Sequence, residues 1–289
     1  MTSQTSSACA VTGASGYVGS IITQELRKHM PVVKLTRNPK SEADIAWSLE
    51  SDLDISRALR SLNVKSLVHA AWEMRANNLR KMEESSVRGS AALFEAAGRA
   101  GVERIVFIST ISAFEGCRSA YGKTKLAVEK LLRGGSNVVL RPGLVFGDQP
   151  GGVFGGIRKQ VQSSSVLPII GKGLAPQYLL HEQTLAESIV RAVCGDFDQT
   201  QAVPITLAHP RAWRFRDLVQ GIAAAEGRKV TLIPIPWHML FAGIRVGEAF
   251  GMSLPFRSDS VISFVHYDRN PDFSVMHSLG IEPLPYEPA

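Results

Sequence analysis

A glycine-rich segment at residues 12–19, TGASGYVG, constrains the fold of this chain more than any other feature. It lies between an apolar run at residues 8–11 and an amphipathic stretch that reaches Met30, so the order predicts a strand, a tight turn and a helix. Glycines at Gly13, Gly16 and Gly19 let the backbone turn and approach a pyrophosphate, which the N–H groups at the start of a helix bind. The segment therefore predicts a dinucleotide site.

The first half of the chain alternates between short β-branched runs and helical patterns. The runs lie at residues 32–35, 44–49, 64–69, 104–109 and 137–140, and the helical patterns at 52–61, about 78–100 and 120–133. This rhythm is typical of βαβ units, so we expect an α/β fold with a Rossmann-like, doubly wound parallel sheet.

A change of texture after Gly147 predicts a second domain. Glycine pairs and a serine run follow, and prolines gather near the end. We expect a dinucleotide-binding domain at residues 1–147 and a smaller C-terminal substrate-binding domain at residues 148–289. A strand near residues 202–207 is expected to return to the main sheet.

Charge and cysteine content narrow the classes of partner. The chain of 289 residues has 32 Lys and Arg against 26 Asp and Glu, a formal charge of +6, but its basic residues are dispersed. This distribution favours anionic small ligands over nucleic acid. Three widely spaced cysteines, Cys9, Cys117 and Cys194, match no metal-ligand spacing, and we expect all three to be buried thiols. With a polar, uncharged beginning at residues 1–7, they favour a cytoplasmic location.

An apolar segment at residues 232–251 needs a separate interpretation. It carries His238, Arg245 and Glu248 and is interrupted by Pro234 and Pro236, so it does not resemble a membrane span. We expect a helix of the substrate domain, and attachment to a membrane surface is the second interpretation.

Candidate catalytic residues lie in and before a predicted helix. Tyr121 and Lys125 are four residues apart, which places both side chains on one helix face. A neighbouring ammonium would lower the phenol pKa of Tyr121 from about 10 toward neutrality, so that it can exchange a proton with an alcohol or carbonyl. Ser109 and Thr110 end the preceding strand, where Thr110 can bond the same oxygen.

In this order of motifs the chain resembles the extended short-chain dehydrogenase/reductase family. The matching pieces are TGASGYVG at 12–19, HAAW at 69–72, FISTISAF at 107–114, YGKTK at 121–125, RPGLVFG at 141–147 and HEQTLA at 181–186. The resemblance implies a nicotinamide dinucleotide, with Tyr121 as the acid/base, Lys125 on the nicotinamide ribose and Thr110 at the family's Ser/Thr position. It also implies a homodimer.

The cofactor-binding residues expected from these motifs extend along the sheet edge. They are Gly13, Ser15, Gly16, Tyr17, Val18, Gly19, Arg37, Leu49, His69, Ala70, Ala71, Ser109, Tyr121, Lys125, Pro142, Gly143, Leu144 and Val145. For the His69 side chain we favour a structural interpretation, in which a histidine at the strand end has its hydrogen bonds satisfied within the protein.

The sequence also departs from the family pattern. Ser86 and Thr184 stand where members commonly carry Asn and Asp, and the loop from Thr110 to Tyr121 is short. Ile111 and Ser112 replace the Asp-Glu pair of dehydratases, which disfavours water elimination, although Glu115 is near in sequence.

Cofactor choice depends on the end of the second strand, which reads LTRN at residues 35–38. It offers no acid for a ribose diol, whereas Arg37 can pair with a 2′-phosphate, so NADP is favoured over NAD.

The leading hypothesis is a nucleotide-sugar 4-epimerase or 4-ketoreductase, with Arg158, Lys159 and Arg257 as candidate contacts for substrate phosphates. One alternative is an NADPH-dependent reductase or dehydrogenase of an apolar alcohol or ketone, sterol-like or flavonol-like, which the apolar sequence at residues 237–256 suggests. The other is a non-catalytic dinucleotide-binding accessory protein. Retention of both Tyr121 and Lys125 favours catalysis.

Overall fold

The computed structural model describes residues 7–51, 53–73, 79–132, 134–148, 151–252 and 257–288. Within these residues, seven parallel strands form one sheet in the order β10-β6-β5-β4-β1-β2-β3. The strands are β1 (Ala8–Thr12), β2 (Val32–Thr36), β3 (Ile45–Ala46), β4 (Val64–His69), β5 (Arg104–Ile108), β6 (Val138–Pro142) and β10 (Ile205–Leu207). The order reverses at β1, between β2 and β4, where sheets of this kind bind ligands.

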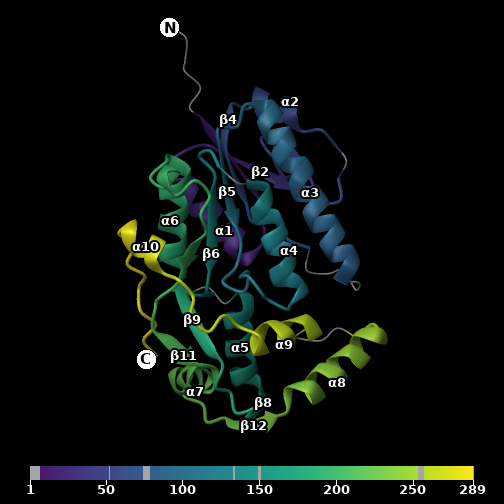
Figure 1. Ribbon diagram of the computed structural model, residues 1–289, viewed down its shortest axis with the longest axis vertical. Helices are drawn as coiled ribbons and strands as arrows, with labels where there is room; N and C mark the ends of the chain where they lie inside the picture. The colour runs from purple at the N-terminus through teal and green to yellow at the C-terminus, as the bar shows by residue number, and fades with distance from the viewer. Residues whose placement is uncertain are drawn as a thin grey trace.

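Helices cover both faces of this sheet (Figure 1). On one face lie α2 (Ser56–Ser61), α3 (Leu79–Ala100) and α4 (Ala120–Glu129), which the short helix η1 (Lys130–Leu132) follows. On the other lie α1 (Tyr17–Leu26), α6 (Glu182–Cys194) and α10 (Ser274–Ser278). The arrangement confirms the predicted Rossmann-like, doubly wound α/β fold.

Burial of both sheet faces explains the continuous apolar strands. In β5, Val106 and Ile108 pack into the core with α1 and α6, whereas Ile105 and Phe107 pack into the core with α3 and α4. Because successive side chains of a strand point to opposite faces, a strand between two helix layers must be apolar at every position.

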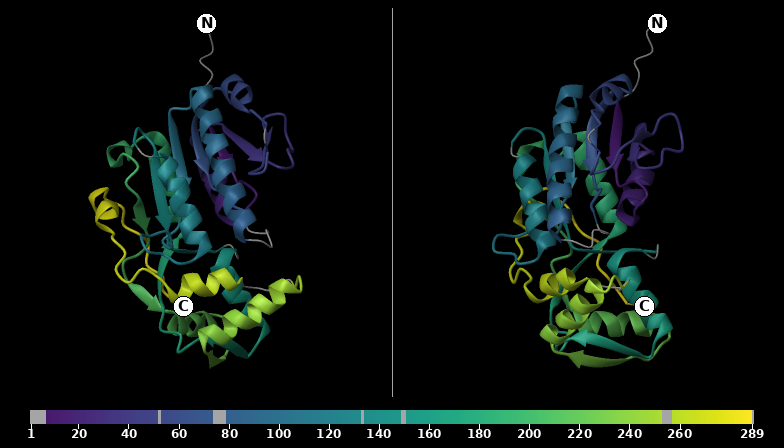
Figure 2. Two further views of the ribbon diagram at one scale, coloured as in Figure 1. Left: turned by 45° about the vertical axis from the view of Figure 1, so that its right-hand side comes forward. Right: turned by 90° about the vertical axis from the view of Figure 1, so that its right-hand side faces the viewer.

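The C-terminal elements gather below the sheet as a smaller lobe (Figure 1, Figure 2). Its strands are β7 (Leu144–Phe146), β8 (Val166–Ile170), β9 (Pro176–His181), β11 (Ala212–Arg214) and β12 (Thr231–Ile235), which form a β11-β9-β7 sheet and a β12-β8 pair. Its helices are α5 (Gly152–Ser163), α7 (Phe215–Ala225), α8 (Trp237–Ala249) and α9 (Ser258–Val265), and the short helix η2 (Asp198–Thr200) lies before β10. The lobe has its own core, which includes Phe154, Leu167 and Leu218.

Some details differ from the sequence-based expectations. The strand predicted at residues 44–49 contains only Ile45 and Ala46, which pair with the end of β2. Cys9 and Cys117 are buried, but the expectation for Cys194 is wrong: it is exposed, as the last residue of α6. Residues 1–6, 52, 78 and 133, on which parts of the predictions fall, lie outside the described residues.

Candidate active site

A cavity of about 1280 Å³ lies between the carboxyl edge of the sheet and the C-terminal lobe. Ordinary small-molecule sites measure roughly 300–1,000 Å³, so this space has room for a dinucleotide and a second molecule. Of the residues expected from the sequence to bind cofactor or to catalyse, all but His69 line it. Gly13 and Lys125, 112 positions apart in the chain, therefore meet at one site.

The glycine turn is built for close backbone approach. Gly13 has a φ of +68°, and a Cβ there would lie 2.8 Å from the backbone nitrogen of Ala71. A Cβ on Gly19 would lie 2.0 Å from the carbonyl oxygen of Gly13. No larger residue fits either position, and α1 begins directly after the turn, at Tyr17, with its first N–H groups at the cavity. This cradle fits a pyrophosphate.

Tyr17 joins the glycine turn to α6. Its hydroxyl donates a hydrogen bond to Glu182 Oε2 at 3.0 Å, and Glu182 Oε1 accepts one from the backbone N–H of Asp148 at 3.1 Å. Burial, followed by the charge of Glu182, raises the pKa of Tyr17. Residues from the TGASGYVG and HEQTLA motifs thus form one contact beside the cavity.

His69 lies behind the site as part of a buried hydrogen-bonded chain. Its Nδ1 lies 2.8 Å from Thr12 Oγ1, and its Nε2 lies 2.9 Å from Ser90 Oγ. Thr12 Oγ1 already accepts from the N–H groups of Ala70 and Ala71, so its one proton must go to Nδ1. His69 is therefore neutral with its proton on Nε2, and burial lowers its pKa to about 3.

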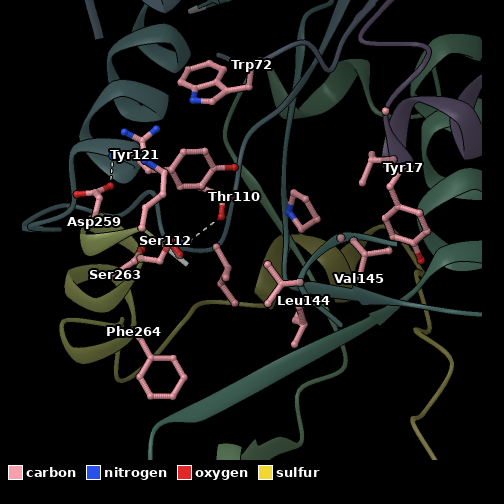
Figure 3. Close-up of a pocket in the computed structure, with 18 of the residues that line it drawn as sticks. Tyr17, Trp72, Thr110, Ser112, Tyr121, Leu144, Val145, Asp259, Ser263 and Phe264 are labelled. Carbon is pink, nitrogen blue, oxygen red and sulfur yellow. Dashed lines mark hydrogen bonds between the residues drawn. The ribbon is translucent and has the colours of Figure 1, made fainter. Parts of the chain in front are cut away.

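Tyr121, in the first turn of α4, faces the strand-end hydroxyl of Thr110, and Trp72 lies on the other side of its ring (Figure 3). The ring of Trp72 meets that of Tyr121 edge to face, with centroids 6.0 Å apart. Burial raises the pKa of Tyr121 to about 12, and a hydrogen bond with Thr110 opposes that rise. The pKa near neutrality expected from the sequence is thus not present in this structure, because burial outweighs the stabilising contacts.

Lys125 is held away from the phenol. Its Nζ donates a hydrogen bond to the carbonyl oxygen of Ile108 at 2.7 Å and lies 3.8 Å from the centroid of the Trp72 ring. The centroid of the Tyr121 ring is farther away, at 5.9 Å. Burial lowers the pKa of Lys125 to about 7, and the charge of Glu129 acts in the opposite direction.

A buried ion pair lies one helical turn beyond Lys125. Glu129 accepts two hydrogen bonds from Arg141, at 2.9 and 2.6 Å, and a further one from Ser109. Ser109, expected near the cofactor, therefore bonds a carboxylate of α4 while it also lines the cavity. The pair ties the RPG motif at residues 141–143 to the helix that carries Tyr121 and Lys125.

Three residues of the site were not recognised from the sequence. Trp72 follows the HAA motif directly, and Glu129 lies four residues after Lys125, so both had a local signal. Asp259 of α9 had none: its carboxylate accepts hydrogen bonds from the backbone N–H groups of Ala120 and Tyr121, more than 130 residues earlier.

The positions that depart from the family pattern have other surroundings. Ser86 is fully buried, and its hydroxyl has no hydrogen-bond partner within the part of the chain that the structure describes. Thr184 accepts a hydrogen bond from the N–H of Leu284 at 3.2 Å and so binds the C-terminal segment to α6. Glu115 is exposed and does not line the cavity, which leaves it outside the reacting site.

The half of the cavity inside the C-terminal lobe has a largely apolar wall, although Gln160, Gln177, Tyr178, Tyr267 and Asp268 also line it. Its lining includes Ile157, Leu167, Ile169, Val219, Leu240, Ile244 and Phe264. Among the described residues, the Lys and Arg side chains of the lining are Arg37, Lys125 and Arg257. Arg158 and Lys159 lie outside it, and Arg158 pairs instead with Glu226, the residue after α7. Of the three cations considered for substrate phosphates, only Arg257 lies at the site.

Two other kinds of feature are absent from the described residues. Over the described ranges, no helix combines the length and the apolar composition that crossing a bilayer requires. In the same residues, no three His, Cys, Asp or Glu side chains are grouped as metal ligands.

Comparisons with known proteins agree with this architecture. Residues 9–195 match the NAD dependent epimerase/dehydratase family. The ceramide reductase of Caulobacter vibrioides is 27% identical over 237 residues, which cover 78% of this chain and 73% of that protein. A mouse mitochondrial protein, NADH dehydrogenase [ubiquinone] 1 alpha subcomplex subunit 9, is 24% identical over 84% of this chain and 64% of its own length.

Solved structures extend the likeness to the fold. The UDP-glucose 4-epimerase of Thermotoga maritima, determined with UDP-glucose, superposes with a TM-score of 0.65 at 17% identity. The match covers 79% of this chain and 85% of the epimerase. With the glycine turn, the parallel sheet and a family match over more than half of its length, the chain belongs to the NAD-dependent epimerase/dehydratase family, in the extended short-chain dehydrogenase/reductase group.

Proposed function

We propose that this protein is an NADPH-dependent reductase that converts a ketone of an amphipathic, largely apolar substrate into a secondary alcohol. The observation that carries the proposal is the apolar wall of the substrate half of the cavity, from Ile157 to Phe264. A nucleotide sugar needs groups that bind a diphosphate and hydroxyls, whereas a long hydrocarbon is stabilised by aliphatic side chains. The similarity to a ceramide reductase supports a lipid-like substrate.

In this proposal the two parts of the chain have separate roles. Residues 1–147 hold the dinucleotide, with the glycine turn at its pyrophosphate, Arg37 at the 2′-phosphate and Lys125 at the nicotinamide ribose. Leu144 and Val145, which line the cavity, would pack beside the nicotinamide. Residues 148–289 supply most of the substrate half. The bound cofactor would supply the hydride for the carbonyl carbon.

Tyr121 is the proposed proton donor to the substrate oxygen, and Thr110 is its hydrogen-bonding partner there. With a pKa of about 12, the phenol is protonated at neutral pH, which is the form that a reduction consumes. An oxidation, including the first step of an epimerase, would instead require the phenolate.

The test is NADPH oxidation, followed by absorbance, with a long-chain ketone in detergent and with a short water-soluble ketone. We expect turnover with both and a loss of at least about 100-fold in the Tyr121→Phe variant. Tyr267, which also lines the cavity, provides the matched control as Tyr267→Phe. Undiminished turnover in Tyr121→Phe would remove the assignment.

A nucleotide-sugar 4-epimerase or 4-ketoreductase is the second candidate. Arg257 at the cavity favours it, because a guanidinium can bind a diphosphate, and the Thermotoga enzyme of the same fold was determined with UDP-glucose. Purification without added cofactor, followed by denaturation and mass spectrometry, separates the two. Retained oxidised NAD would point to an epimerase, whereas an empty or NADP-exchanging protein would point to a reductase.

A further inference from the structure

Helix α8 exposes an apolar face to the outside of the molecule. The side chains of Met239 and Val246 in the helix are exposed by 61% and 56%. Phe250, the residue directly after the helix, is exposed by 81%. At 100° per residue these three positions point within roughly 40° of one another. Large apolar side chains gathered on one exposed face mark an interaction surface, since water contact there is unfavourable.

A second face of the same helix, roughly 100–140° around the helix axis from Met239, forms a wall of the cavity. Leu240 and Ile244 line the substrate half, and Ile244 is buried. Figure 1 and the left view of Figure 2 place α8 at the outer edge of the C-terminal lobe. One helix therefore separates the apolar interior from an apolar exterior.

The segment that carries this face has a net positive charge. Residues 228–257 contain Arg228, Lys229, Arg245 and Arg257, and their single acidic residue is Glu248. Glu248 accepts hydrogen bonds from the backbone N–H and hydroxyl of Ser258, and it lies 3.8 Å from Arg245 in an ion pair. Arg228, Lys229 and Arg245 are exposed, and Trp237, an aromatic residue with affinity for membrane interfaces, begins the helix. Such a surface complements anionic lipid headgroups.

We propose that α8 is a membrane-docking helix that lies in the plane of an anionic lipid surface, with the cavity on its inner side. A helix of 13 residues is about 20 Å long, less than the roughly 30 Å of a bilayer core, so it fits the interface. A face about 20 Å by 10 Å offers about 200 Å², well below the roughly 800 Å² that each partner buries in a stable dimer. A membrane is thus the better-matched occupant, and its role as a source of substrate rests on the proposed function.

The experiment is vesicle flotation of the full-length protein. We expect it to float with vesicles of phosphatidylglycerol and phosphatidylcholine and to dissociate as salt is raised, because screening weakens attraction to the headgroups. Phosphatidylcholine vesicles should bind it less. Replacement of two exposed side chains, Met239→Glu with Val246→Glu, should lower the bound fraction by about tenfold or more. Leu131→Glu with Val203→Glu, at exposed apolar positions of the Rossmann half, is the matched control.

Two further readouts keep the result unambiguous. Thermal unfolding of both double variants tests folding, and turnover of the short water-soluble ketone tests the catalytic site without any membrane. If the wild type binds vesicles and the α8 variant does not, the result supports the docking surface. If in addition no ketone is reduced, only the proposed function fails. Turnover without vesicle binding overturns the surface and leaves the function. Equal vesicle binding by the wild type and the folded α8 variant also overturns the docking surface. So does a dimeric wild type whose α8 variant is monomeric, because the face would then bind a second copy of the chain.

Discussion

The carboxylate of Asp259 in α9 accepts a hydrogen bond from the backbone N–H of Tyr121 at 2.9 Å. Its second oxygen accepts one from Ala120 at 2.8 Å, so that a side chain of the C-terminal lobe binds the first N–H groups of α4. These N–H groups have no partner inside their own helix, and an anion there also interacts favourably with the helix dipole. The position of Tyr121 therefore depends on the lobe that forms the substrate half of the cavity.

Asp259→Ala should lower both turnover and stability. The loss of a helix-capping acceptor costs about 1 kcal/mol, and displacement of Tyr121 should reduce kcat by about tenfold or more. Asp259→Asn keeps one acceptor oxygen and should be intermediate. Ketone turnover and the melting temperature are the measurements, with Asp217→Ala, in the first turn of α7, as control. An unchanged kcat in a folded Asp259→Ala variant would show that the hydrogen bonds of Asp259 to α4 are not needed to position Tyr121 for catalysis.

Glu129→Gln should destabilise the protein and alter its pH profile. Arg141 would lose its charged partner in a largely buried position, at a cost of about 3 kcal/mol of unfolding free energy. The charge of Glu129 raises the pKa of Lys125, so its removal should move the alkaline limb of kcat/KM to lower pH. Urea unfolding and rate measurements across pH test both effects. Glu84→Gln, in an exposed pair with Arg80, should change neither.

Arg37→Ala should change the preference between the two nicotinamide cofactors. Arg37 lines the cavity after β2, where a charge-assisted bond to a 2′-phosphate contributes roughly 1.5–3 kcal/mol. The KM for NADPH should therefore rise by about 10- to 100-fold, with little change for NADH. Lys40→Ala, a nearby cation outside the cavity lining, is the control. Equal effects on the two cofactors would contradict recognition of the phosphate.

The buried neutral His69 should make stability depend on pH below neutrality. Burial lowers its pKa from 6.5 to about 3 in the folded protein, so between these values only the unfolded chain binds the proton. Stability should fall as pH falls from 6.5, by up to about 1.4 kcal/mol per pH unit from this group. Urea unfolding between pH 7 and 5 should give a flatter dependence for His69→Asn. The exposed His277→Asn variant should keep the wild-type slope.

Local sequence determined the parts of this protein that depend on a few neighbouring residues. The glycine turn follows from residues 12–19 because only glycine allows the positive φ and close contacts of Gly13. The shared face of Tyr121 and Lys125 follows from helical spacing, and the apolar strands follow from burial between two helix layers. Most of the cofactor-side lining was predictable for the same reason, since parallel strands bring their carboxyl ends to one edge.

Tertiary structure alone decided what depends on distant contacts. The pKa of Tyr121 is high because packing removes water from the phenol, which spacing to Lys125 does not reveal. Lys125 is directed to Ile108 and Trp72 by the sheet and by the loop after β4. Because the C-terminal lobe folds against the sheet edge, Asp259 reaches α4. The same packing places one apolar face of α8 in the cavity and leaves another in solvent. Hydropathy records that α8 is apolar, but packing decides which of its faces are covered.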